Sequence, residues 1–155
     1  MSMLLCFEVV SPLPRLVSCR DLKNTAAELV HVLNLPRASS VSLRFVSAAV
    51  MTKINHTQRG RSVVTDVLSF AVADELRALT PPSERCELGD LIICSSQATA
   101  EARRRGVDAH EEHIRLIVHG VLHLNGYDHA TAVQEAHMFA LQERIVSLIC
   151  PVSVE

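Results

Sequence analysis

Hydrophobic positions recur along the chain in short runs that suit β-strands. Residues 3–10 form a mostly apolar run that ends before Pro12, and residues 41–45 alternate apolar with polar side chains. Two further runs rich in Val, Leu and Ile, at residues 65–71 and 88–94, are typical of central strands. The pattern therefore predicts a sheet of four strands.

Helical segments lie between these runs. Residues 21–33 repeat their apolar side chains at spacings of three and four before Pro36, which predicts an amphipathic helix, and residues 48–55 predict a short one. Capping signals predict three more helices. These signals are Ser95 or Ser96 before residues 97–105, Asp108 with Glu111 before a helix ending near Leu124, and Thr131 with Gln134 before a helix ending near Pro151. Residues 74–87 predict a long connecting loop.

This mixture of strands and helices predicts an α/β fold. We expect one domain over residues 1–155, in which a four-stranded mixed sheet is layered with helices. A chain of 155 residues is long enough to bury one substantial core. Because the chain has only 4 Phe, 1 Tyr and no Trp, that core must be aliphatic.

The formal net charge is −2 with the 8 histidines taken as neutral, which excludes a strongly basic protein that attracts nucleic acid with its whole surface. Any RNA contact must therefore be local. The 5 cysteines contain no CxxC pair and predict reduced thiols. No stretch approaches the ~18 apolar residues of a membrane span, and the chain starts without a secretion signal. We expect a cytoplasmic protein with no membrane contact.

The segment HGVLHLNGYDH, residues 119–129, concentrates the candidate chemistry. On a helix, His119 and His123 lie one turn apart on the same face, so both imidazoles can reach one ion. Gly126 permits a positive-φ turn that can return His129 to the same point. A single histidine would most often be a core or surface residue, but three at this spacing predict a metal site.

Three protein ligands on a tetrahedral metal leave a fourth position for water, which is the arrangement of catalytic zinc sites. Zinc lowers the pKa of that water to about 7, so hydrolysis is the implied chemistry. We expect one Zn²⁺ ion per chain, because imidazole ligands suit zinc. His110 and His113 start the same predicted helix away from this face, and we assign both to the surface.

The histidine spacing matches the zinc helix of metzincin proteases, HExxHxxGxxH, with one departure. Gly120 stands where those proteases have the glutamate that acts as general base. Without this proton acceptor, peptide hydrolysis is disfavoured. We therefore expect a zincin-like metal helix in a hydrolase of another kind.

HGVLHLNGYDH resembles the signature of the YbeY family, and two upstream segments strengthen the likeness. QRGRSVVTDVLSFA is similar to the family's arginine loop followed by TDVLSF, and LGDLIIC is similar to its next strand motif. The similarity runs from about Val41 to Ile149. The chain departs from the usual family pattern at three positions. Gln58 stands in place of an aromatic residue, and Val64 and Ala71 stand in place of prolines. They change the loop and leave the histidines intact.

The resemblance implies a zinc-dependent, single-strand-specific endoribonuclease that acts in ribosomal RNA maturation, at the 3′ end of small-subunit 16S rRNA, and in ribosome quality control. It makes His119, His123 and His129 the metal ligands and Arg59 the catalytic residue. A guanidinium suits a phosphate whose charge grows in the transition state. The implied partners are single-stranded and pre-ribosomal RNA, and the small ribosomal subunit with its assembly factors.

Several alternatives stay open. The protein could be another metal-dependent hydrolase, or a non-catalytic ribosome-assembly factor with a structural metal. Asp66, Asp90 and Asp128 are all candidate proton acceptors or hydrogen-bond partners of the ligand histidines. The three arginines at residues 103–105 fit either an RNA-binding patch or a helix end favoured by the helix dipole.

Overall fold

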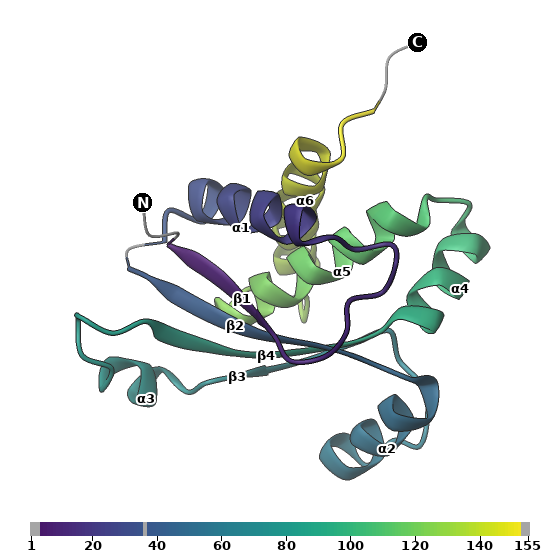
Figure 1. Ribbon diagram of the computed structural model, residues 1–155, viewed down its shortest axis with the longest axis horizontal. Helices are drawn as coiled ribbons and strands as arrows, with labels where there is room; N and C mark the ends of the chain where they lie inside the picture. The colour runs from purple at the N-terminus through teal and green to yellow at the C-terminus, as the bar shows by residue number, and fades with distance from the viewer. Residues whose placement is uncertain (1–3, 36, 153–155) are drawn as a thin grey trace.

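The structure is a computed structural model, and it describes residues 4–35 and 37–152 (Figure 1). Four strands lie within these residues: β1 (Leu5–Val9), β2 (Ser39–Val46), β3 (Val67–Ala71) and β4 (Cys86–Cys94). Six helices lie there as well: α1 (Cys19–Leu33), α2 (Ala48–Arg59), α3 (Asp74–Ala78), α4 (Ser95–Arg105), α5 (Ala109–Leu124) and α6 (Ala132–Ile149).

The strands form one mixed sheet in the order β1-β2-β4-β3. The first three strands in this order run parallel, and β3 pairs antiparallel with β4 at the edge. Parallel neighbours cannot be joined by a tight hairpin, so helical crossovers connect them. The predicted four-stranded mixed sheet is confirmed.

Helices cover both faces of the sheet unequally. In Figure 1, α1, α5 and α6 lie over one face and α2 lies against the other. The main core forms under α5, where Leu91 and Ile93 of β4 meet Ile117 and Val121. The buried apolar side chains of the described residues are Leu, Ile, Val, Ala, Met and Cys, which confirms the aliphatic core.

Helix α5 is enclosed on most sides, and 11 of its 16 residues are buried. Its start is fixed by Asp108, whose carboxylate accepts a hydrogen bond of 3.0 Å from the backbone N–H of Glu111, as the capping signal predicted. A helix held between the sheet, α4 and α6 gives its side chains a rigid base.

The region predicted as a long loop, residues 74–87, contains more regular structure than expected. Helix α3 occupies its first part, and β4 already begins at its end. The reason is Arg77, whose guanidinium donates hydrogen bonds of 2.7 Å to the carbonyl oxygens of Leu88 and Leu124. These contacts tie α3 to β4 and to the end of α5.

Two helix boundaries also differ from their predictions. Helix α2 continues through Arg59, so this residue ends a helix instead of lying in a loop. Helix α4 begins directly after Cys94 and has no side-chain cap, so neither Ser95 nor Ser96 serves as the predicted N-cap. The expected start of the first strand at Met3 lies outside the described residues.

The assignment of His113 to the surface is wrong, because its side chain is fully buried between α4 and α5. Its Nε2 atom lies 2.8 Å from the hydroxyl oxygen of Ser95, and its Nδ1 atom lies 2.7 Å from the carbonyl oxygen of Ala109. The two polar partners make burial of the imidazole tolerable. His110 is partly exposed and lies 3.1 Å from a carboxylate oxygen of Asp21.

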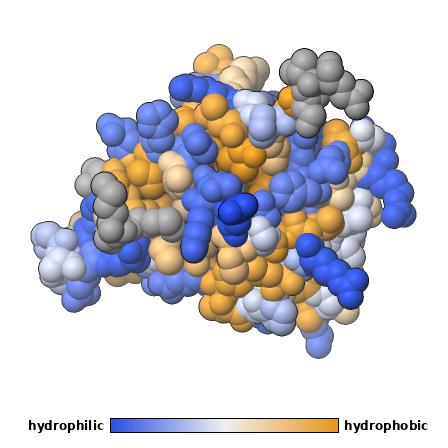
Figure 2. Space-filling model, turned by 45° about the horizontal axis from the view of Figure 1, so that its top comes forward, coloured by the Kyte–Doolittle hydropathy of each residue, from blue (hydrophilic) through white to orange (hydrophobic). Residues whose placement is uncertain are grey.

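Hydrophilic and hydrophobic residues are interspersed over the face seen in Figure 2. Among the described residues, every helix is too short or too polar to span a bilayer. All five cysteines are free of disulfide bonds. These features agree with the balanced charge of the sequence. The chemistry of the protein must therefore be inferred from the arrangement of individual side chains.

Candidate metal centre

The three histidines predicted as metal ligands meet beside α5. His119 and His123 project from adjacent turns of this helix, with their Nε2 atoms 3.1 Å apart. His129 follows in the connection to α6, with its ring centroid 5.7 Å from that of His119 and 5.0 Å from that of His123. One ligand nitrogen of each residue lies within 4.8 Å of the others. The predicted convergence is confirmed.

The connection after α5 folds back because Gly126 adopts a φ of 88°, in the left-handed region that suits glycine. Two hydrogen bonds close this turn, from the backbone N–H groups of Gly126 and Tyr127 to the carbonyl oxygens of His123 and Leu122. The turn reverses the chain over the last turn of the helix. The position of His129 therefore follows from the glycine that the sequence predicted.

The ring orientations of the two helical histidines leave their Nε2 atoms facing each other. Nδ1 of His119 lies 2.8 Å from the side-chain oxygen Oε1 of Gln142, and Nδ1 of His123 lies 2.9 Å from the carbonyl oxygen of Tyr127. Both oxygens can only accept, so each Nδ1 carries the hydrogen. Two lone pairs then point at each other across 3.1 Å. A cation shared by the two atoms would remove this repulsion, and three imidazole nitrogens are a donor set that fits zinc.

The pKa values of both helical histidines are lowered. Burial is the main cause for His119, and the nearby His129 adds to it. Burial is also the main cause for His123, with a further contribution from His119. The imidazoles are therefore neutral at pH 7, which is the form that binds a metal ion.

The histidines line a cavity of about 430 Å³, within the roughly 300–1,000 Å³ of small-ligand sites. Thr65, Val67 and Ser69 form another part of its wall, at the edge strand β3 and just before it. The three histidines thus border an open space beside the sheet edge, where a substrate can approach.

Arg59, the predicted catalytic residue, lies on the wall of the same cavity. It ends α2, and Gly60 follows with a φ of 67°, in the left-handed turn that often ends helices. Asn55, buried one turn earlier, donates its amide to the carbonyl oxygen of Val63 at 2.9 Å and ties the loop to the helix. Arg59 itself is exposed, so its guanidinium is accessible to a ligand.

Gly120, at the position of the metzincin glutamate, packs closely against the sheet. A Cβ atom at this position would collide with the side chain of Leu91, which is fully buried on β4. A side chain at position 120 would require Leu91 to shift within the core. The structure therefore gives a steric reason why a general base is absent at this position.

Two of the three candidate aspartates lie on the wall of the histidine cavity. Burial raises the pKa of Asp66. Asp128 accepts a hydrogen bond of 2.8 Å from the backbone N–H of His129 and so braces the turn. The Nδ1 partners described above are an amide and a backbone carbonyl, so these carboxylates do not take that role for the helical histidines.

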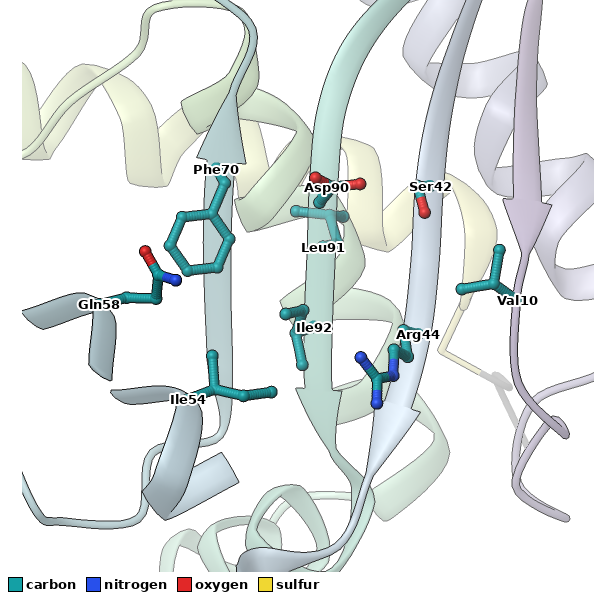
Figure 3. A pocket seen from close by; sticks show the side chains of 9 residues that line it. All are labelled: Val10, Ser42, Arg44, Ile54, Gln58, Phe70, Asp90, Leu91 and Ile92. Carbon is teal, nitrogen blue, oxygen red and sulfur yellow. The ribbon is translucent and has the colours of Figure 1, made fainter. Parts of the chain in front are cut away.

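Asp90, the third candidate, lies in a separate groove on the opposite face of the sheet (Figure 3). Its carboxylate lines this groove together with Arg44, Phe70 and Gln58. Successive side chains of a strand point to opposite faces, which separates Asp90 from the histidines. Gln58 also faces this groove, so its departure from the family pattern does not alter the wall of the histidine cavity.

The other two departures lie in the loop after α2 and at the end of β3. Val64 lines a smaller hollow together with Arg59 and Arg61. Ala71 is the exposed last residue of β3. Neither residue lines the histidine cavity.

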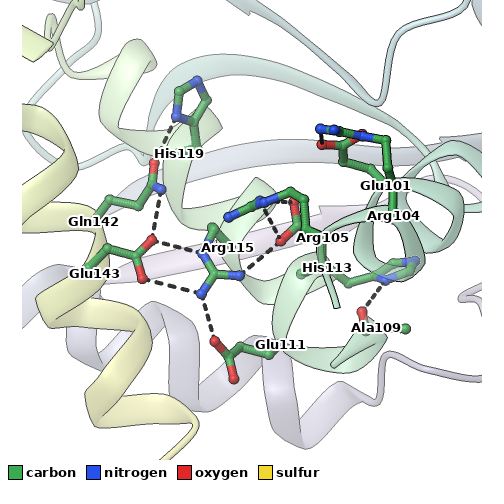
Figure 4. A network of polar contacts seen from close by, with 11 residues as sticks. Glu101, Arg104, Arg105, Ala109, Glu111, His113, Arg115, His119, Gln142 and Glu143 are labelled. Atoms are coloured by element: carbon green, nitrogen blue, oxygen red, sulfur yellow. Dashed lines mark hydrogen bonds and ion pairs between the residues drawn. The ribbon is translucent and has the colours of Figure 1, made fainter. Parts of the chain in front are cut away.

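The run of arginines at the end of α4 is largely paired with acidic side chains (Figure 4). Arg104 donates to the carboxylate of Glu101, with its Nε atom 3.0 Å from Oε2. Arg105 donates to the carboxylate of Glu112 at 3.2 and 3.3 Å. These pairs favour a charge-compensated helix end over a free basic patch.

Sequence reasoning did not identify Gln142, the side-chain partner of His119. A signal was present, because Gln142 lies four residues after Met138 and three before Ile145, on the buried face of α6. A polar residue in phase with an apolar stripe needs a hydrogen-bond partner. Which partner it finds depends on how α5 and α6 pack.

Comparisons with known proteins place the chain in a family. A family model described as endoribonuclease YbeY matches residues 16–149. A relative from Limosilactobacillus fermentum, named endoribonuclease YbeY, is 38% identical over 125 residues, which cover 77% of this chain and 80% of the relative. A second relative named endoribonuclease YbeY, from Roseiflexus castenholzii, is 33% identical over 143 residues. These cover 92% of this chain and 90% of the relative.

A solved structure supports the fold. The solution structure of TM1509 from Thermotoga maritima matches with a TM-score of 0.63 at 23% identity, over 93% of this chain and 89% of that one. The family model covers the elements that carry Arg59 and the three histidines. This chain therefore belongs to the endoribonuclease YbeY family.

Proposed function

We propose that this protein is a zinc-dependent endoribonuclease that cleaves single-stranded RNA, with His119, His123 and His129 as the ligands of one zinc ion. The observation that carries the proposal is the pair of Nε2 atoms that face each other across 3.1 Å beside His129, in a cavity that Arg59 also lines. Family membership supplies the reaction class.

The histidines and Arg59 would have different roles in the cleavage of RNA. A bound zinc ion would supply a Lewis acid that polarises the scissile phosphate. Arg59 holds the phosphate by its planar set of N–H donors and stabilises the charge that grows on it. The lowered pKa values of the helical histidines keep protons from competing with the ion at neutral pH.

We further propose that the substrate is precursor ribosomal RNA, that the enzyme matures the 3′ end of the 16S rRNA, and that it acts in ribosome quality control. Its partners would then be the small ribosomal subunit and its assembly factors, in the cytoplasm. The family resemblance supports this assignment. The balanced net charge of −2 also suits a protein that reaches RNA through a local site or through bound partners.

Cleavage of a labelled single-stranded RNA from the 3′ region of 16S rRNA tests the proposal. Purified protein with quantified zinc should cut the strand and leave a matched duplex intact. His123→Ala should lose both zinc and cleavage. Arg59→Ala should keep zinc but cut about 10²–10³-fold more slowly, because one donor to the transition state is lost.

Arg103→Ala is the matched control, since Arg103 is exposed on α4 and does not line the histidine cavity. It should cleave like the wild type. If zinc binds through the histidines and the wild type cuts no RNA, the catalytic proposal fails, and a non-catalytic role in ribosome assembly takes its place. Equal rates for Arg59→Ala and Arg103→Ala would remove Arg59 from the reaction.

A further inference from the structure

The ring of His119 is held by a side chain from the neighbouring helix. Oε1 of Gln142 on α6 lies 2.8 Å from Nδ1 of His119, and only 7% of the glutamine surface is exposed. An amide oxygen cannot donate, so the contact requires the hydrogen of the neutral imidazole on Nδ1. The lone pair of His119 then belongs to Nε2, the atom that faces His123.

The orientation of the Gln142 amide is itself fixed by a charge. Its Nε2 atom donates to Oε1 of Glu143 at 3.1 Å. A flipped amide would present its oxygen to that carboxylate and its NH₂ group to His119, so the carboxylate selects the orientation seen in Figure 4. Glu143 is therefore what makes the amide an acceptor for the histidine.

Glu143 is held in turn by a guanidinium from the helix that carries the histidine. Nε and Nη2 of Arg115 lie 2.8 and 3.2 Å from the two carboxylate oxygens of Glu143. The hydrogen bond from Arg115 lowers the pKa of Glu143 and keeps it ionised. Because Arg115 lies one turn before His119 on α5, the contacts form a closed ring between α5 and α6 (Figure 4).

The guanidinium of Arg115 is anchored at its other side as well. It donates to the carboxylates of Glu111 at 2.6 Å and Glu112 at 2.8 Å, and the residue is only 8% exposed. These partners leave Arg115 little freedom to turn away from Glu143. Arg115 therefore holds the carboxylate of Glu143 in a fixed position.

The second helical ligand is held differently. Nδ1 of His123 faces the backbone carbonyl of Tyr127 at 2.9 Å, so no side-chain substitution removes that acceptor. Of the two candidate ligands on α5, only His119 has a side chain as the described partner of its Nδ1 atom. We propose that Gln142 is a positioning residue of the metal site: held by Glu143 and Arg115, its amide fixes the tautomer and rotation of His119.

This inference deepens the proposed metal site and rests on it. Partners behind a metal ligand fix its tautomer and ring orientation, and their loss typically weakens metal affinity about 10–100-fold. The same residues could serve only to join α5 to α6. The two roles differ in one respect, because a purely structural Gln142 would leave the protonation of the His119 ring unaffected.

The first test is Gln142→Met, which removes the amide and keeps a side chain of similar length. We expect zinc affinity to fall about 10–100-fold in a competition titration. In the metal-free protein at neutral pH, long-range ¹H–¹⁵N spectra should show His119 as the Nδ1–H tautomer in the wild type and as a mixture in the variant. Gln97→Met on α4 is the matched control, and it should leave both measurements unchanged.

A second test asks whether Glu143 acts through Gln142. Glu143→Gln removes the charge that orients the amide, and zinc affinity should fall, though less than in Gln142→Met. In the double variant, Glu143→Gln should cause no additional loss, because the amide that it orients is gone. A purely structural role predicts additive losses, so additivity would overturn the inference.

The outcomes separate this inference from the proposed function. If the wild type binds no zinc, the proposed function fails at the metal, while the tautomer spectra still test the action of Gln142 on His119. If the wild type binds zinc and Gln142→Met matches Gln97→Met in affinity and tautomer, only the positioning role is refuted. Should Gln142→Met fail to fold, Glu143→Gln carries the test alone, because its carboxylate is half exposed.

Discussion

In His119 and His123, burial and hydrogen bonding prepare the imidazole rings for the metal binding that we propose. Each ring has an acceptor behind Nδ1, and burial lowers the pKa of each imidazole. An ion that enters displaces no proton at pH 7. Protons compete for the same nitrogens only when the pH falls below the usual histidine value, toward the lowered pKa values of these two residues.

This arrangement predicts how the stability of the metal-free protein depends on pH. Because the folded-state pKa values of His119 and His123 lie below 6.5, the unfolded chain binds more protons once the pH falls past 6.5. The free energy of unfolding should therefore decrease from pH 6.5 down to the lowered pKa values, with no further contribution from these residues below them.

Urea unfolding in the presence of a chelator, from about pH 8 to about pH 5, checks this dependence. His119→Gln should flatten part of the decrease. His31→Gln, at an exposed position on α1, should leave the curve unchanged. A wild-type curve that stays level below pH 6.5, or equal effects of the two variants, would contradict the prediction.

At the level of elements, the close approach of α5 to β4 decides what chemistry the helix can carry. Gly120 brings the helix backbone against the buried side chain of Leu91. Helix propensity favours alanine over glycine by roughly 0.5–1 kcal/mol, whereas overpacking a core costs typically about 1–3 kcal/mol. Overpacking therefore outweighs helix propensity at this position.

Gly120→Ala should accordingly destabilise the protein by about 1–2 kcal/mol in urea unfolding, against its helix propensity. The double variant with Leu91→Ala provides the control. In that background the new methyl group finds space, so Gly120→Ala should be neutral or stabilising. The same destabilisation in both backgrounds would show that the contact with Leu91 is not the cause.

Strands and helices were largely predictable, because hydrophobic period and capping residues act locally. The helix before Gly106 and the capping box of Thr131 and Gln134 appear as expected. Misassignments occurred where a distant contact decides the local structure. Arg77 orders α3 through carbonyl groups on β4 and α5, and Ser95 of α4 gives the buried ring of His113 a partner.

The residues of the candidate site also differ in whether local sequence or a distant contact places them. His119, His123 and His129 could be predicted because one helix and one glycine turn bring them together within eleven positions of the sequence. Gln142 could not, because its contact with His119 spans 23 residues and depends on the packing of α6. The side chain that orients a ligand is thus less visible in a sequence than the ligand.

For the whole molecule, a metal ion that binds only the folded chain adds its binding free energy to stability. At a zinc concentration 100 times Kd, the free energy of unfolding should rise by about 2.7 kcal/mol. Thermal unfolding with and without zinc measures the gain. His123→Ala should show none, and Arg59→Ala should show the full gain; a gain in His123→Ala would place the ion elsewhere.

The position of α6 links the metal to the assembly of the fold. His129 lies just before this helix, and Gln142, which in our proposal orients His119, lies on it, so the orientation of His119 depends on docking of α6 on α5. Zinc occupancy and docking of α6 are then one coupled equilibrium. Bound zinc would therefore stabilise the contact of α6 with α5. A chelator would weaken this contact while the sheet stays intact.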